Sequence, residues 1–281
     1  MPLYPLPIES IPGDMLPKEA HALFAERLAG LLQQEQWQYL SRAILDDNCA
    51  EWSDAAAPLA ITTEETTWAR GIIQSMRLEH ATAESHLPTT IGRGALTTHA
   101  YRSQHPNTYD RTHLGNQVPY EEVLGLNGYI SWSFPGYSPM SKYPARLTLP
   151  ALRLLESPDT LVFPYDAPLM GTMYSLEVDV ARNQAMALRG PDYLKLLPKY
   201  MIAEERGLDI AAYYPDWVRV PGVGPRTYRL AEIRTLGNVS LRPDDPDWKI
   251  EVPLTWLGIE SVLDQLDPDV RELRIVDTSP K

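Results

Sequence analysis

Proline is the residue that most limits how this chain can fold. The sequence holds 26 prolines in 281 residues, close to double the usual share of about 5%. Because proline lacks a backbone donor and clashes with the preceding helical turn, long uninterrupted helices are restricted to a few windows. Short strands, turns and a small number of helices are therefore expected.

Two helical windows lie in the first third of the chain. Over residues 17–45 apolar side chains recur every three or four positions, which predicts one helix or a pair of helices. A second helix is expected after Thr62, because Thr62 and Glu65 have the spacing of a capping box, and it should end before Pro88. Residues 1–88 are thus expected to form an acidic helical region, with five Lys or Arg against 13 Asp or Glu and a net charge of −8.

From residue 89 the pattern changes to short extended runs separated by glycine and proline, which is typical of strands. The segments expected to be extended are ALTTHAYRS, GYISWSF, RLTL, TLVFPY and MYSLEVDVA, with later ones at 208–214, 226–233, 248–252 and 272–276. One helix is expected over residues 191–206, kinked or divided at Pro198, and a short helix near 256–266. Residues 89–281 are therefore predicted to form an α+β domain after the helical region.

Charge and cysteine content narrow the functional classes. A net charge of −12 repels phosphate backbones and anionic lipids, so neither non-specific nucleic-acid binding nor membrane binding is expected. No stretch approaches the roughly 20 apolar residues of a membrane span, and the first residues do not look like a secretory signal. The single cysteine, Cys49, cannot form an internal disulfide, which fits a reducing compartment. We expect a cytoplasmic protein, or a secreted effector that acts in the cytosol of a target cell.

Several common catalytic motifs are absent from the sequence. It contains no G-x-G-x-x-G, no G-x-x-x-x-G-K-[ST], no H-E-x-x-H and no G-x-S-x-G, so the nucleotide-binding, zinc-protease and hydrolase classes lose their main support. His99, His105 and His113 fall within 15 residues. They lie among turn-forming residues with no cysteine beside them, which favours loop histidines, and no metal site is predicted.

A different signal comes from the order of the segments after residue 95. An expected strand, HAYRS, carries Arg102, and a second strand, YISWS, carries Ser131 and Ser133 on one face. Later strand-like segments and the 191–206 helix follow. This order resembles the ADP-ribosyltransferase-like fold over about residues 95–240. In that family an early strand ends in arginine or carries histidine, a second strand carries a Ser-x-Ser pattern, and a later strand carries a catalytic glutamate.

The resemblance implies a mainly antiparallel split sheet with flanking helices, and NAD as the substrate. Arg102 would hold the ribose or diphosphate oxygens with its planar fork of donors. Ser131 would brace the pocket, and Glu232 in TYRLAEI is the positional candidate for the carboxylate that stabilises positive charge on the ribose. The residues expected to bind NAD are His99, Tyr101, Arg102, Tyr129, Ser131, Ser133 and Tyr137.

The sequence leaves open whether the chain is an enzyme, because no Glu-x-Glu occurs on a late strand. The first hypothesis is an NAD-dependent ADP-ribosyltransferase, a toxin or effector that modifies an unidentified macromolecular acceptor. One alternative is an NAD glycohydrolase, which uses water as the acceptor. The other is a non-enzymatic acidic binding protein, of the immunity or antitoxin kind, with a basic protein partner. In that case Arg102 would form a surface ion pair, and Ser131 and Ser133 would face solvent.

Overall fold

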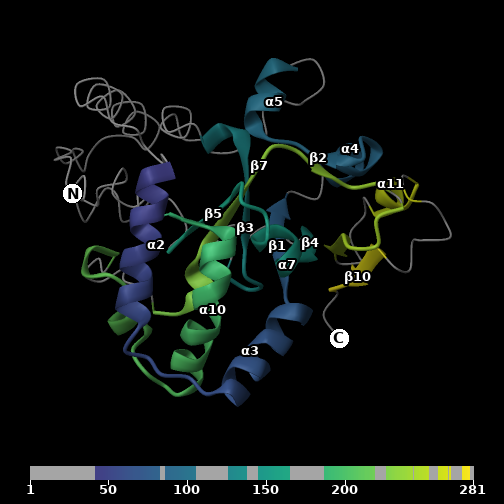
Figure 1. Cartoon of the computed structure of the whole chain (residues 1–281). Coiled ribbons are helices and arrows are strands. Elements are labelled where there is room, and N and C mark those ends of the chain that lie inside the picture. The colour runs from purple at the N-terminus through teal and green to yellow at the C-terminus, as the bar shows by residue number, and fades with distance from the viewer. Residues whose placement is uncertain are drawn as a thin grey trace, which may run out of the picture.

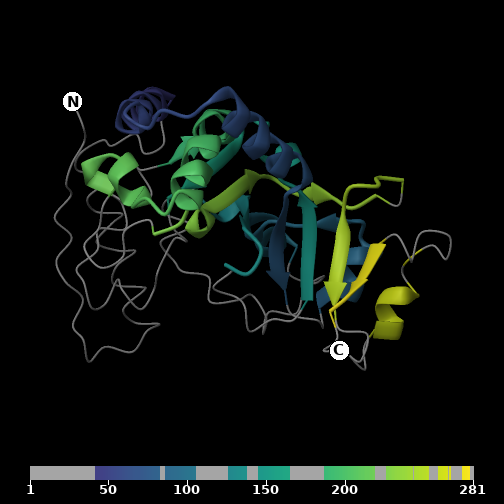
Figure 2. The same cartoon turned by 90° about the horizontal axis from the view of Figure 1, so that it is seen from below.

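The computed structural model describes residues 42–82, 86–105, 126–137, 145–164, 187–218, 226–242, 244–252, 259–264, 266 and 274–278. Within these ranges the chain forms an eight-stranded sheet and a separate two-stranded sheet (Figure 1). Helices α2, α3 and α10 gather beside the larger sheet, as a second view confirms (Figure 2). The predicted α+β class with a mainly antiparallel sheet is therefore confirmed.

The longest helices in the described ranges are α2 (Arg42–Ala56), α3 (Thr63–Ser75) and α10 (Gly190–Glu205). Helix α3 begins with the predicted capping box: Glu65 N donates to Thr62 Oγ1 at 3.1 Å, and Thr62 N donates to Glu65 Oε2 at 2.8 Å. Helix α10 continues through Pro198, so the proline does not divide it. The helix predicted over residues 17–45 lies outside the described residues, except for its last four positions, which belong to α2.

The shorter helices are α4 (Leu87–Gly92), α5 (His99–Gln104), α7 (Ala151–Leu155) and α11 (Ile259–Leu263). Single 3-10 turns form η4 (Leu126–Gly128), η5 (Ile210–Tyr213), η6 (Asp216–Val218) and η7 (Tyr228–Leu230). Helix α11 confirms the short helix predicted near 256–266. Across the described part of the chain, no helix combines the length and apolar character that crossing a bilayer requires.

The larger sheet has the strand order β10-β9-β4-β1-β3-β7-β5-β6. Its strands are β1 (Arg77–Thr82), β3 (Tyr129–Ser133), β4 (Ala145–Pro150), β5 (Thr160–Phe163), β6 (Leu188–Arg189), β7 (Glu232–Leu236), β9 (Lys249–Val252) and β10 (Ile275–Asp277). The smaller sheet pairs β2 (Ala95–Leu96) with β8 (Val239–Ser240). All pairs are antiparallel except β9 with β10. Strands β1, β3 and β7, far apart in the sequence, therefore lie side by side.

Strands β3, β4, β5 and β9 confirm four of the predicted extended segments, and β10 overlaps a fifth. The MYSLEVDVA segment lies outside the described residues. The segment at 226–233 is only partly a strand, because the turn η7 precedes β7. Residues 208–214 are not extended: the side chain of Asp209 accepts from Ala211 N at 3.0 Å and caps the turn η5.

Strand β1 is a correction to the region expected to be helical. Residues 77–82 fall inside the range 1–88, yet they form a central strand that pairs with β3 and β4. The helix after Thr62 ends at Ser75, just before this strand. The division of the chain into regions 1–88 and 89–281 stays a prediction.

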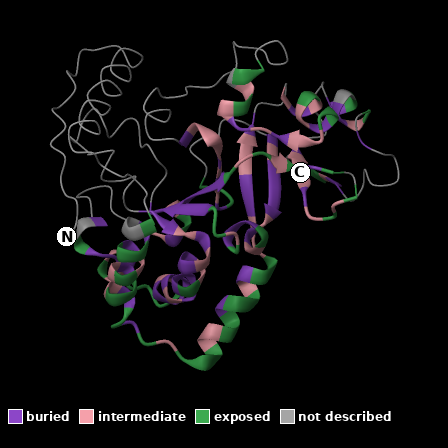
Figure 3. Ribbon diagram, turned by 45° about the horizontal axis from the view of Figure 1, so that its top comes forward, coloured by how far each residue is buried: buried purple, intermediate pink, exposed green. Residues whose placement is uncertain are grey.

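The two faces of the central strands differ in chemistry. Along β3, Ile130 and Trp132 are buried, whereas the alternate residues Tyr129, Ser131 and Ser133 are only partly buried. Figure 3 shows buried residues concentrated in the strands and in α10, while α3 is more exposed. Apolar side chains on one face thus build the core, and polar side chains collect on the other.

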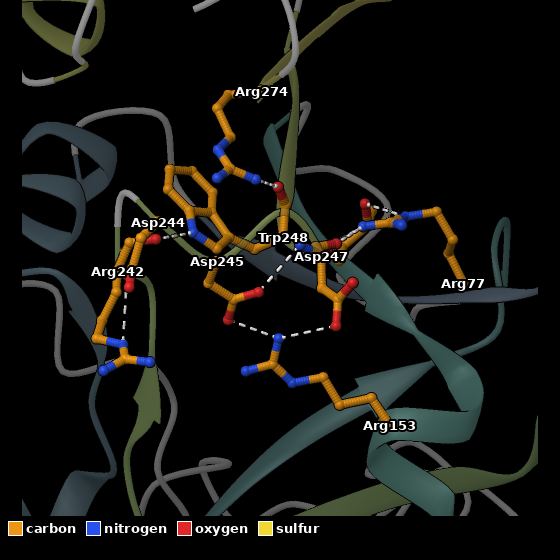
Figure 4. Close-up of polar contacts among 9 residues, drawn as sticks. Arg77, Arg153, Arg242, Asp244, Asp245, Asp247, Trp248 and Arg274 are labelled. Atoms are coloured by element: carbon orange, nitrogen blue, oxygen red, sulfur yellow. Dashed lines mark hydrogen bonds and ion pairs between the residues drawn. The ribbon is translucent and has the colours of Figure 1, made fainter. Parts of the chain in front are cut away.

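Arg153 and Arg274 attach the loop before β9 to the rest of the fold (Figure 4). Arg153, in the last turn of α7, lies 2.6 Å from a carboxylate oxygen of Asp245 and 3.2 Å from one of Asp247. Arg274 lies 4.5 Å from the ring centre of Trp248 and donates to the Trp248 carbonyl at 3.1 Å. These contacts fix the start of β9 against α7 and against Arg274, the residue before β10.

Candidate active site

A row of polar side chains crosses the three central strands. Glu79 on β1 pairs with Ser133 on β3, and Ser133 pairs with Glu232 on β7. Directly paired residues in a sheet point to the same face, so these three side chains lie on one side. Glu79 is 4% exposed and Glu232 is 3% exposed, whereas Ser133 between them is only partly buried. Two nearly buried carboxylates therefore flank a small hydroxyl residue.

The carboxylate of Glu232 accepts two hydrogen bonds, one from β3 and one from its own strand. Ser131 Oγ donates to Glu232 Oε1 at 2.6 Å. Arg234 Nε donates to the same oxygen at 3.0 Å, and Arg234 is itself buried. Charge-assisted hydrogen bonds of this kind are short and strongly favour the ionised carboxylate. Glu232 is thus presented as an oriented anion beside the Ser-x-Ser strand.

Glu79 has a different set of partners. Arg146 Nε on β4 lies 3.4 Å from Glu79 Oε2, and Gly136 N donates to Glu79 Oε1 at 3.3 Å. Burial raises the pKa of the Glu79 carboxyl, although Arg146 and the Gly136 N–H oppose this rise. The two carboxylates of the row therefore differ in environment. A guanidinium donates a hydrogen bond to Glu232, whereas burial is the largest influence on the pKa of Glu79.

His80 lies beside Ser131 on the neighbouring strand. Its Nδ1 is 2.8 Å from the Ser131 carbonyl oxygen, and its ring packs edge-on to Trp132 with ring centres 5.8 Å apart. Because a carbonyl only accepts, Nδ1 carries the proton and Nε2 is left as an acceptor. Burial, with a smaller contribution from the positive charge of Arg102, lowers the His80 pKa to about 4, although the hydrogen bond to the Ser131 carbonyl opposes this fall. The imidazole is therefore neutral at pH 7.

Arg102 reaches this neighbourhood from a helix rather than from a strand. Residues 99–104 form α5, because Thr98 Oγ1 accepts from Tyr101 N at 3.2 Å and caps the helix. The prediction that HAYRS ends a strand is therefore wrong. The positive charge of Arg102 lowers the pKa of His80, whose side chain lies on the face of β1 opposite Glu79. His99 begins the same helix and is partly buried.

The predicted aromatic binding residues occupy separate surroundings. Tyr101 is 39% exposed on α5 and stacks on His105, with ring centres 4.2 Å apart. Tyr137 is 37% exposed and follows the turn after β3, where the guanidinium of Arg229 lies 5.9 Å from its ring centre. Tyr129 begins β3 on the same face as Ser131, and burial raises its pKa. The NAD-binding roles of these residues and of Ser133 stay predictions.

The sequence-based prediction missed Glu79 and Arg234, which lie on the face of the polar row, and His80, which lies on the opposite face of β1. Glu79 and His80 were missed because their segment was expected to be helical. Arg234 could have been predicted from the sequence. It lies two residues after Glu232, and alternate residues of a strand share a face, so both side chains lie on one face of β7. The contact between Ser131 and Glu232 depends on the pairing of β3 with β7, which joins residues about a hundred positions apart.

Metal-binding groups do not gather in the described ranges. No three His, Cys, Asp or Glu side chains there approach closely enough to hold an ion. His113, one of the three clustered histidines, lies outside those ranges. The polar row and the side chains that contact it contribute carboxylates, hydroxyls and guanidinium groups.

The sequence matches no family model and no curated protein. Among solved structures, the chain is similar to DarT from Thermus sp. 2.9 in complex with ADP-ribosylated ssDNA. The two share 16% sequence identity over 72% of this chain and 93% of that chain, with a TM-score of 0.37. At this level of similarity, the side chains on β1, β3 and β7, rather than the likeness, support the function proposed next.

Proposed function

We propose that this chain is an ADP-ribosyltransferase that uses NAD as its substrate, with Glu232 as the catalytic carboxylate. The observation that carries the proposal is the 2.6 Å hydrogen bond from Ser131 to Glu232. It joins the Ser-x-Ser strand, one of the segments that carry the resemblance in the sequence, to Glu232, the positional candidate for the catalytic carboxylate. Strands β3 and β7 are direct neighbours in the sheet.

The chemistry requires a carboxylate in this setting. Cleavage of the bond between nicotinamide and ribose releases neutral nicotinamide with the bonding electron pair and leaves positive charge on the ribose. An oriented, buried carboxylate stabilises that charge as the carboxylates of glycoside hydrolases do. Ser131 and Arg234 hold Glu232 in one orientation, so it needs little rearrangement when the charge develops.

Other residues near the row supply groups that suit the rest of NAD. Arg102 would donate to the diphosphate or ribose oxygens. Tyr129 and Tyr137 would contact the nicotinamide or adenine ring. The acceptor of ADP-ribose would be a macromolecule, as expected for a toxin or effector that works in a cytosol.

One observation favours the non-enzymatic alternative. Glu232 and Arg234 form an ion pair in which each side chain is 3% exposed, and a buried pair of this kind can be purely structural. The chain would then be an acidic binding protein whose partner is basic. An NAD glycohydrolase would use the same residues with water as the acceptor, so the two enzymatic hypotheses share one test.

The test is nicotinamide release from NAD, followed by chromatography, with NAD binding measured by calorimetry. We expect the wild-type chain to release nicotinamide and Glu232→Gln to lose at least about a hundredfold of that rate. Glu205→Gln is the matched control, because Glu205 is an exposed carboxylate at the end of α10. A wild-type chain that neither binds NAD nor releases nicotinamide, but copurifies with a basic protein, would favour the binding-protein alternative.

A further inference from the structure

The second carboxylate of the polar row has no role in the chemistry described so far. Glu79 and Glu232 are separated by one strand, β3, and by one residue, Ser133. Two strand spacings place their backbones roughly 10 Å apart. In glycoside hydrolases, carboxyl groups about 6.5–9.5 Å apart leave room for a nucleophile that attacks the sugar from the side opposite the leaving group. The backbones of Glu79 and Glu232 are separated by a distance of the same order.

We propose that Glu79 is the base that takes the proton from the acceptor nucleophile. This inference rests on the proposed function, and it assigns the second half of the same reaction. The bond between C1 of the ribose and the nicotinamide nitrogen breaks, and the electron pair leaves with nicotinamide. A bond forms between C1 and the oxygen or nitrogen of the acceptor, whose proton passes to the Glu79 carboxylate. Glu232 stabilises the positive charge on the ribose while the first bond breaks and the second forms.

The surroundings of Glu79 suit a base. Its two carboxylate oxygens contact Arg146 and Gly136 N, and each oxygen keeps a second lone pair that can accept a proton. Ser133, between the carboxylates, is only partly buried, which leaves access over the middle of the row.

The charged groups that face Glu79 explain how readily it gains a proton. Arg146 reaches it from β4, and Glu251 acts on it from β9, where Glu251 pairs with Arg146. Glu232 lies across β3. Burial and the negative charge of Glu251 raise the Glu79 pKa, while Arg146 lowers it. A raised carboxyl pKa brings a base closer to the pH at which it works.

Azide can show whether Glu79 acts as a base or has only a structural role. Azide is a nucleophile with no proton to lose, so its reaction needs no base. Nicotinamide release is measured with water alone and with added azide, for wild type, Glu79→Gln, Glu79→Ala and Glu232→Gln. We expect both Glu79 variants to lose about a hundredfold of the rate with water. Azide should restore most of the rate in Glu79→Ala and none in Glu232→Gln. Glu205→Gln should match wild type throughout.

Arg146→Gln gives a second measurement with Glu79 intact. Because Arg146 lowers the Glu79 pKa, its loss should move the acid limb of the pH–rate profile to higher pH. The same limb should disappear in Glu79→Gln, and NAD binding should stay within about threefold of wild type in both.

The outcomes separate this inference from the proposed function. An unchanged rate and pH profile in Glu79→Gln would overturn the role of Glu79 while leaving Glu232 as the catalytic carboxylate. A slow Glu79→Ala variant that azide does not rescue, or that no longer binds NAD, would make Glu79 a structural or binding residue. If wild type released no nicotinamide even with azide, the proposed function and this inference would both fail.

Discussion

Ser131 Oγ donates to Glu232 Oε1 at 2.6 Å, across two strands that are about a hundred residues apart in the sequence. Arg234 Nε donates to the same oxygen at 3.0 Å. Both donors therefore act on Oε1 and hold that oxygen in one position. A side chain held in this way is preorganised, which is how enzymes stabilise charge that appears only in the transition state.

Ser131→Ala removes one of these donors and leaves the carboxylate in place. Hydrogen bonds to charged groups contribute about 1.5–3 kcal/mol, so nicotinamide release should fall about tenfold to a hundredfold. The variant should also lose up to about 3 kcal/mol of its free energy of unfolding, so the rates are compared at a temperature where both proteins are folded. Ser75→Ala is the control, because Ser75 is exposed and its hydroxyl donates to the Ile72 carbonyl within α3 rather than to a residue of the site. Equal rates for Ser131→Ala and wild type would show that the hydrogen bond does not serve catalysis.

Arg234→Met tests the ion pair itself. Removing one member of a buried pair leaves an uncompensated charge and typically costs about 3–5 kcal/mol. Glu232 and Arg234 are both nearly buried, so urea unfolding should show a loss of that size. The double variant Glu232→Gln with Arg234→Met should recover part of it. If the double variant is less stable than Arg234→Met alone, the pair is not the source of the effect.

The parts of the fold that the sequence predicted are those governed by local rules. The capping box of Thr62 and Glu65 gives the start of α3, and alternation along β3 places Ser131 and Ser133 on one face. Glu232 was predicted only from its position in the pattern of the ADP-ribosyltransferase-like family. Its contact with Ser131 depends on the pairing of β3 with β7, which no local sequence pattern specifies.

Two errors share one physical cause. The segments around Arg102 and at 208–214 look extended by composition, yet each begins with a side chain that caps a helical turn. Thr98 accepts from Tyr101 N, and Asp209 accepts from Ala211 N. Capping by one oxygen outweighed the strand preference of the aromatic residues that follow. The strand β1 was missed for another reason: it is short, directly follows a helix, and is stabilised by its neighbours β3 and β4.

Two glycine substitutions should change stability in opposite directions. At Gly190, the first residue of α10, a Cβ would lie 2.4 Å from the Leu155 carbonyl oxygen. The backbone must shift to relieve that contact, so Gly190→Ala should destabilise the fold by about 1–3 kcal/mol. At Gly71, inside α3, a Cβ meets nothing within 4 Å, and Gly71→Ala should stabilise it by up to about 1 kcal/mol. Urea unfolding measures both, and a neutral Gly190→Ala would contradict the close approach of α10 and α7.

His80 should make the stability of the fold depend on pH in the mildly acidic range. Its pKa falls from 6.5 to about 4 in the folded chain, chiefly because burial disfavours the charged ring. Below pH 6.5 the unfolded chain therefore binds a proton that the folded chain does not bind until about pH 4. The free energy of unfolding should fall as the pH drops through this window, by at most about 3 kcal/mol, and should return as the pH rises. His80→Phe should remove this part of the pH dependence, whereas His105→Gln, at an exposed position, should leave it. If the His80→Phe and wild-type curves kept the same slope between pH 4 and 6.5, the histidine would not be the neutral, Nδ1-protonated ring that holds the Ser131 carbonyl.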